Sequence, residues 1–204
     1  KTVLSNSMKN RLFILVQFFG LLVCTIDAQV TGTFTDTRDG KTYKTITIGT
    51  QTWMLENLAY KTDAGCWAYD NDPKNVPVFG YLYTFSAARR ACPEGWHIPS
   101  ADEWKILITS QGDNRFAGDK LKTANWKKLE SSPNNKSGFS AVAAGEYDAD
   151  AASFSGKEEL TSWWSSTVEN KYMYTVFVLH YDASNVSVNT DFDTNGHSVR
   201  CMKD

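Results

Sequence analysis

The run from Cys92 to Trp104 constrains the fold of this chain more than any other stretch. It reads CPEGWHIPSADEW, and its prolines and glycine predict a sharp, rigid link. The link would join a helix over residues 79–91 to a second helix that begins at Ser100. Glu103, three residues after Ser100, completes a capping box, in which the two residues satisfy free N–H groups at a helix start.

Apolar residues at helical spacing follow on both sides of this link. Trp104, Leu107 and Ile108 predict a buried stripe on the second helix. Tyr81 and Phe85 recur at similar spacing on the first. We therefore expect the two helices to share one core.

The first 28 residues have the pattern of a secretory signal peptide after a short upstream extension. Residues 8–11 are basic, residues 12–24 are apolar, and Ala28 precedes a cleavage point before Gln29. The apolar run is too short to cross a bilayer. A retained membrane anchor and lipidation at Cys24 are the alternatives, but Val23 is large for the position before a lipidated cysteine. We expect a secreted or cell-surface protein whose domain spans residues 29–204, and a lipid anchor would be its only membrane contact.

The charge of the mature chain argues against nucleic acid as a partner. Cleavage takes three basic and one acidic residue from totals of 21 and 23, which leaves a net charge of −4 and no basic patch. About 176 residues suit one domain with a sizeable core. Three cysteines remain (Cys66, Cys92 and Cys201), so export implies at least one disulfide, and three choices of bridge stay open.

Strand patterns lie at both ends of the mature chain. Residues 30–36, 42–48 and 51–55 predict a meander, and residues 60–78 and 147–159 predict loops. Residues 160–166 predict a strand, and residues 172–181 are apolar on both faces, which is typical of a strand inside a sheet. Residues 198–202 predict a final strand. Strands at both ends with helices between them indicate an α+β domain whose two ends meet in one sheet.

Several short motifs, taken in order, are similar to those of the Fibrobacter succinogenes major paralogous domain, which is found in exported proteins of Fibrobacter and Bacteroidetes. They include DGKTYK at 39–44, WMLENL at 53–58, CPEGWHIPS at 92–100, SGFSA at 137–141, WWSS at 163–166 and SVRC at 198–201. The resemblance covers nearly all of residues 34–204. It implies a C-type lectin-like fold, with two helices packed on a small antiparallel sheet that holds the N- and C-terminal strands together, and with long loops.

The same resemblance implies a disulfide between Cys92 and Cys201. Many relatives carry a second cysteine about nine residues after the position of Cys66, where this chain has Asn75 and Val76. Cys66 is therefore expected to be unpaired. Formylglycine-generating enzymes share the fold and use two C-terminal cysteines for oxidation, but only Cys201 is present here.

Nothing else in the sequence indicates catalysis or a cofactor. None of the three histidines has zinc-ligand spacing, and no Gly-x-Ser-x-Gly elbow occurs. His97 is interpreted as structural, and His180 and His197 as surface residues of the last sheet. The run 70–72 (DND) offers oxygen ligands for Ca²⁺, but an Asx turn before Pro73 explains it better. We expect no enzyme, no cofactor and no metal site.

The C-terminal region carries the candidate binding residues. Tyrosines supply stacking area, and asparagines and aspartates supply hydrogen bonds. The candidates are Tyr172, Tyr174, His180, Tyr181, Asn185, Asn189, Asp191, Asp193 and Asn195. They predict a recognition module that binds a glycan or a surface protein. The alternatives are a structural or adhesin-tip subunit, and a hypervariable target of a diversity-generating retroelement.

Overall fold

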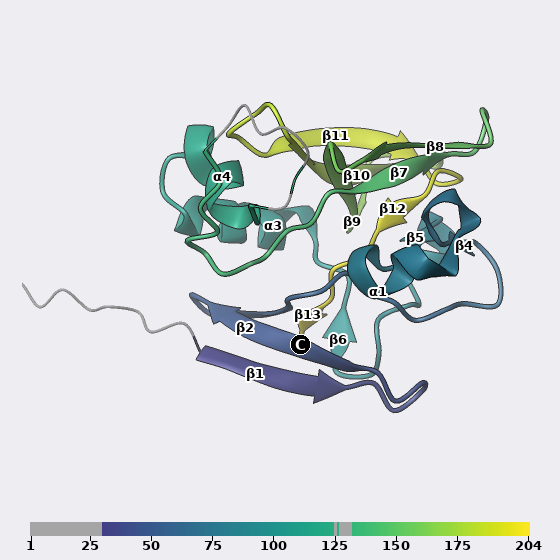
Figure 1. The fold of residues 1–204 in the computed structure, drawn as a ribbon, viewed down its shortest axis with the longest axis horizontal. Coiled ribbons are helices and arrows are strands. Elements are labelled where there is room, and N and C mark those ends of the chain that lie inside the picture. The colour runs from purple at the N-terminus through teal and green to yellow at the C-terminus, as the bar shows by residue number, and fades with distance from the viewer. Residues whose placement is uncertain (1–29, 125, 127–131) are drawn as a thin grey trace, which may run out of the picture.

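The computed structural model describes residues 30–204 except 125 and 127–131 (Figure 1). The predicted signal peptide lies outside the described residues. Within them, no helix combines the length and the apolar character needed to span a bilayer. The chain folds into mixed α+β structure, mostly strands in two sheets with a few short helices.

The smaller sheet has five strands and lies in the lower half of Figure 1. Its order is β1 (Val30–Thr35), β2 (Thr42–Ile48), β3 (Gln51–Met54), β13 (Met202–Lys203) and β6 (Trp96–His97). The first and last strands of the described chain thus belong to one sheet, as the sequence predicts. All pairs in this sheet are antiparallel.

The larger sheet fills the upper half of Figure 1 and contains the C-terminal hairpin. Its order is β11 (Ser187–Phe192), β10 (Met173–His180), β9 (Leu160–Val168), β12 (His197–Ser198), β5 (Leu82–Tyr83) and β4 (Cys66–Trp67). A hairpin of β7 (Ala144–Asp148) and β8 (Ser153–Lys157) joins it through β9. The prediction for residues 172–181 is confirmed, because β10 lies between two neighbours. The loop predicted over residues 147–159 is wrong, because β8 and the end of β7 lie there.

The helices are short. They are α1 (Val76–Phe79), α2 (Phe85–Ala88), α3 (Ala101–Ser110) and α4 (Ala117–Leu121), with 3₁₀ turns at Tyr69–Asn71, Pro73–Asn75 and Asn114–Phe116. The helix predicted over residues 79–91 is wrong for most of its length. Gly80 ends α1 with a φ of 75°, and a Cβ there would lie 2.6 Å from the carbonyl oxygen of Leu58. The chain must therefore turn, and it pairs as β5 before α2 begins.

The second predicted helix is confirmed as α3. The Ser100 side chain accepts from the Glu103 N–H, and the Glu103 carboxylate accepts from the Ser100 N–H, so the capping box is present. Trp104, Leu107 and Ile108 are buried. The first turn of α3 is therefore fixed by local sequence alone.

Two cores, not one, fill the molecule, and β9 separates them. Successive side chains of a strand point to opposite faces. Trp163 accordingly packs in the cluster that contains Trp104 of α3, while Trp164 packs in the cluster that contains Phe85 of α2. The expectation that both helices share one core is wrong, because the sheet that carries β9 lies between them.

The last residues join the two sheets. The sequence predicts one strand over 198–202, but β12 ends at Ser198 in the larger sheet and β13 begins at Met202 in the smaller one. Between them, the carbonyl of Val199 accepts from the Leu58 N–H at 2.8 Å, and that of Cys201 accepts from the Met54 N–H at 3.0 Å. The segment crosses between sheets because its backbone bonds go to Met54 at the end of β3 and to Leu58 just after it.

A disulfide fixes this crossing. Cys92 and Cys201 are bonded, with their Cα atoms 5.9 Å apart, as the family resemblance implies. Cys66 is free and half-buried. The bridge ties the link before α3 to the end of the chain, 109 residues away.

Candidate functional site

The predicted binding residues occupy two ends of the β10–β11 hairpin. His180, Tyr181 and Asn185 lie at or near the turn that joins the two strands, and Asn189 lies within β11. The other five lie toward the opposite end: Tyr172, Tyr174, Asp191, Asp193 and Asn195. The ends are about 24 Å apart for a strand of this length, so the nine residues do not form one site.

Only some of these side chains are available to a ligand. Tyr172 is 55 % exposed, and Asn185 and Asn189 are also exposed. Tyr174 stacks on Phe85 with ring centroids 3.5 Å apart. Tyr174 therefore serves packing.

The remaining candidates are mostly half-buried and have partners within the chain. Tyr181 packs against the core cluster that contains Trp104, and His180 Nδ1 lies 3.1 Å from an Asp182 carboxylate oxygen. The carbonyl of Asp193 accepts from the Phe85 N–H at 3.0 Å. These residues position the hairpin rather than present a surface.

Asp191 and Asn195 belong to a buried polar network around His197. His197 Nε2 donates to an Asp191 carboxylate oxygen at 2.9 Å, and its Nδ1 lies 2.5 Å from Ser162 Oγ. Asn195 donates to Asp191 at 2.8 Å and accepts from the Ala149 N–H at 3.0 Å. His197 is 1 % exposed. Its interpretation as a surface residue is wrong, because the turn at Asn195 and Gly196 folds its ring against Trp164.

The sequence of contacts from Ser162 through His197 to Asp191 has the composition of a hydrolase triad. Accessibility argues against that role. Ser162 and His197 are both buried, with exposed fractions of 0 % and 1 %. A substrate carbonyl has no open path to the Ser162 oxygen. The arrangement instead links β9, β11 and β12 with the loop after β7.

This network should make the free energy of unfolding depend on pH in the acidic range. Burial raises the pKa of Asp191, but hydrogen bonds from His197, the Phe192 N–H and Asn195 outweigh it and hold the pKa below the ordinary 3.8. The Asp191 carboxylate therefore binds a proton more readily in the unfolded state than in the folded state. Its contribution to the free energy of unfolding is complete above pH 3.8 and is lost as the pH falls through the pKa of the folded state. We expect Asp191→Asn to lower the free energy of unfolding by about 1–2 kcal/mol at neutral pH, and by less in acid.

Urea denaturation of both proteins at about pH 7 and about pH 3 measures this difference. The exposed Asp102→Asn variant is the matched control and should show a small effect at both pH values. An Asp191→Asn effect that is the same at both pH values would contradict the proposed linkage.

A row of aromatic rings beside this network was missed by the sequence interpretation. Trp67 stacks on Tyr147 at 4.4 Å between centroids, Tyr147 contacts Phe154 at 4.9 Å, and Phe154 contacts Tyr69 at 5.3 Å. The row joins β4 to the β7–β8 hairpin. A Cβ on Gly196 would lie 2.9 Å from that of Tyr147, so the last turn packs directly against it. The row was missed because residues 147–159 were predicted to be a loop.

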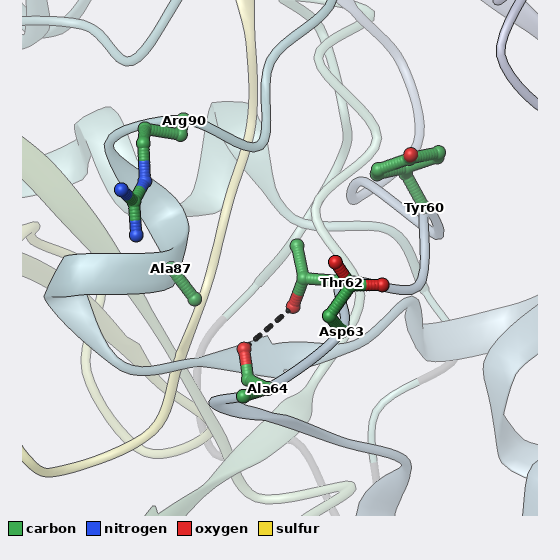
Figure 2. A pocket seen from close by; sticks show the side chains of 6 residues that line it. All are labelled: Tyr60, Thr62, Asp63, Ala64, Ala87 and Arg90. Carbon is green, nitrogen blue, oxygen red and sulfur yellow. Dashed lines mark hydrogen bonds between the residues drawn. The ribbon is translucent and has the colours of Figure 1, made fainter.

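A polar hollow opens between α2 and the segment before β4 (Figure 2). It has a volume of about 380 Å³ and is lined by Tyr60, Thr62, Asp63, Ala64, Ala87 and Arg90. Figure 2 shows Arg90 and Ala87 on one side of the opening and Tyr60 and Asp63 on the other, while Thr62 Oγ1 donates to the Ala64 carbonyl at 2.9 Å. A ring, a cation and a carboxylate could together hold a small polar ligand.

Exposed apolar side chains gather where β9 turns into β10. Val168 is 58 % exposed, Tyr172 55 % and Phe192 52 %. Phe192 is paired with Met173, and Val168 with Tyr174, so all three lie at the same end of these strands. Val188, also on β11, is 51 % exposed. These four are half of the large exposed hydrophobic residues in the described chain.

Two other features have structural explanations. His97 Nε2 lies 3.1 Å from Glu103 Oε1, and its Nδ1 lies 2.6 Å from Asp204 Oδ1, so it ties β6 to α3 and to the chain end. The Asp72 side chain accepts from the Lys74 N–H at 3.0 Å, which is the predicted Asx turn at Pro73. Within the described residues, no cluster of three or more potential metal ligands is found.

Comparison with known proteins gives one positive result. The family model of the Fibrobacter succinogenes major domain matches residues 46–203. No curated protein and no solved structure gives a significant match. The matched range runs from β2 to β13 and contains both cysteines of the disulfide.

Proposed function

Because this chain belongs to the Fibrobacter succinogenes major domain family, we propose that it is an exported, non-catalytic recognition module. It binds a glycan or a surface protein through its C-terminal strands. The observation that carries the proposal is the pair of exposed side chains at the end of β9 and β10, Val168 and Tyr172, which the register places on the same face of the sheet. Exposed apolar groups on a rigid sheet are typical of interaction sites.

The disulfide and the burial of the serine–histidine contact support this reading over catalysis. A cross-link between Cys92 and Cys201 suits an exported domain, and the buried Ser162 lacks access to a substrate. The lectin-like fold that the family resemblance implies would also place ligands near the C-terminal part. Tyr172 supplies stacking area, and Asn189, farther along the hairpin, supplies hydrogen bonds.

Binding to glycan and surface-protein arrays tests the proposal. We expect Tyr172→Ala to weaken binding about tenfold or more, as for a central aromatic anchor, and Asn189→Ala to weaken it less. Phe116→Ala is the matched control, because Phe116 is an aromatic residue of similar exposure, 53 %, on a different element. Unchanged binding in both hairpin variants would remove this face as the site.

The polar hollow at Arg90 is the second candidate site for a glycan. Its lining of Tyr60, Asp63 and Arg90 favours a small polar ligand over an apolar one. Arg90→Ala in the same arrays separates the two surfaces. Binding that is lost in Arg90→Ala and kept in Tyr172→Ala would move the site to the hollow.

The two alternative roles have their own signatures. A structural or adhesin-tip subunit would show no binding on the arrays. A retroelement target would vary between strains within about residues 170–197, at adenine-rich codons. Because Val176, Phe177 and Leu179 are buried, such variation should be confined to exposed positions, such as Tyr172, Asn185 and Asn189.

A further inference from the structure

The outer strand of the larger sheet, β11, has an unprotected edge. It is the first strand in the sheet order and runs along the upper margin of the molecule in Figure 1. It pairs with β10 over six consecutive residues without a bulge. Its sequence, SVNTDF, contains none of the Pro and Lys residues that protect many natural edge strands.

The backbone groups on this edge can be assigned from the pairing. The Asp193 N–H donates to the Tyr172 carbonyl at 3.0 Å, so these two residues form a hydrogen-bonded pair in the same register. Hydrogen-bonded and non-bonded pairs alternate along an antiparallel ladder. Asn189 and Asp191 therefore direct their backbone groups toward β10, while Val188, Thr190 and Phe192 direct theirs outward.

Two of these three outward positions have no partner in the chain. The Phe192 N–H donates to the Asp191 side chain, and its carbonyl accepts from the Asn195 N–H. Among the described residues, no such bond occurs for the outward groups of Val188 and Thr190. These two residues supply two donors and two acceptors that point away from the sheet.

The side chains of β11 are complementary to a second copy of the same strand. A two-fold axis at Thr190 would let the two Thr190 residues exchange both backbone hydrogen bonds, and it would place Val188 opposite Phe192 of the second copy, twice, on one face of a continuous sheet. At those two positions the Phe192 N–H would exchange its Asp191 partner for the Val188 carbonyl. On the other face, Asn189 would lie opposite Asp191, so no like charges meet. Val188 and Phe192 are 51 % and 52 % exposed, which leaves them free to form these pairs. An axis one residue earlier, at Asn189, would place Val188 opposite Thr190. An axis one residue later, at Asp191, would place two Asp191 carboxylates opposite each other.

We propose that β11 pairs with β11 of a second copy of this chain, antiparallel and centred on Thr190, which extends the sheet across a dimer. The other six-residue edge strand, β1, is less suited, because Gly32 in its middle offers no side chain for cross-strand packing. The interface is one strand per chain, so the dimer is weak and forms with rising concentration. This inference requires no ligand and does not depend on the proposed recognition role.

Sedimentation equilibrium across a micromolar to millimolar series tests the proposal. The wild-type mass should rise toward that of two chains. Thr190→Lys places two ammonium groups directly opposite each other and should weaken dimerisation at least tenfold. Asn189→Lys, the adjacent exposed residue with the same charge change, faces Asp191 of the partner and should leave the dimer intact. A wild-type protein that remains at the mass of one chain throughout would overturn the proposal.

A charge pair tests the register. Val188→Lys and Phe192→Glu should each weaken the dimer, and the double variant should restore it, because each lysine then faces a glutamate. No rescue in the double variant, or a dimer lost in Asn189→Lys and kept in Thr190→Lys, would overturn the pairing centred on Thr190. Circular dichroism of each variant shows that the monomer remains folded, and array binding by a monomeric Thr190→Lys separates dimerisation from ligand recognition.

Discussion

Replacing Arg200 by methionine should lower the free energy of unfolding by about 3–5 kcal/mol, because it leaves several buried acceptors unsatisfied at a cost of about 1–3 kcal/mol each. Arg200 is 0 % exposed and lies between the two sheets. Its Nη1 donates to the carbonyls of Leu55 and Phe139, each at 2.8 Å, and its Nε and Nη2 donate to Asn57 Oδ1 at 3.1 and 2.9 Å. Methionine fills a similar volume but leaves these buried acceptors without those donors.

The guanidinium group keeps its charge despite its burial. Burial lowers the pKa of Arg200 to about 9, so the side chain is still protonated at neutral pH. Arg200 Cζ lies 4.5 Å from the centre of the Phe139 ring, which offers a cation–π contact. Arg200→Lys retains the charge but presents its donors from a single nitrogen. We therefore expect its free energy of unfolding to lie between those of wild type and Arg200→Met.

Urea denaturation with fluorescence detection measures the loss. Arg89→Met is the matched control, because Arg89 is exposed and its replacement should change stability by about 0.5 kcal/mol or less. If Arg200→Met resembled Arg89→Met, the guanidinium would not be what connects the sheets, and the close contacts around it would contribute little.

The importance of Arg200 could not be derived from the sequence. Position 200 reads as one residue of a final strand, and its partners lie between 61 and 146 residues away in the chain. Local patterns carry no information on such separations. The same reason explains why one predicted strand is two, since only the tertiary bonds to Met54 and Leu58 divide it.

Local patterns succeed where one element satisfies its own requirements. The capping box at Ser100 fixes the start of α3, and the two-sided apolar pattern of residues 172–181 correctly indicates an interior strand. The helix predicted over residues 79–91 fails because Tyr81 and Phe85 have helical spacing, while Gly80 and the pairing of β5 override it. Tertiary pairing routinely overrides such weak local preferences.

The candidate site is predicted less completely than the fold. Tyr172 and Asn189 are exposed, whereas Asp191 and Asn195, which were predicted on the same grounds, serve the network around His197. Turn residues and ligand-binding residues draw on the same amino acids. Only the position of His197 in space separates the two classes here.

Removal of the disulfide should have an effect at least as large as that of Arg200→Met. The bridge spans 109 residues, and in the chain-entropy model a loop of this length stabilises the folded state by roughly 4–5 kcal/mol. We expect a Cys92→Ala, Cys201→Ala double variant to lose stability of this size in urea denaturation. Both replacements are needed, because a single one leaves a thiol that can react with Cys66 or a second chain.

Thiol titration and one further variant complete this test. Denatured wild type that begins at Gln29, without Cys24, should expose one reactive thiol, that of Cys66, in the absence of reductant. Cys66→Ala should cost far less than the double variant, because Cys66 is half-buried and its Sγ makes only a long contact, 3.6 Å, to the Thr62 carbonyl. Wild type measured in strong reductant should approach the double variant, since both have the same open loop. Three reactive thiols, or a double variant as stable as wild type, would mean that the crossing between sheets is held by the hydrogen bonds of Val199, Arg200 and Cys201 alone.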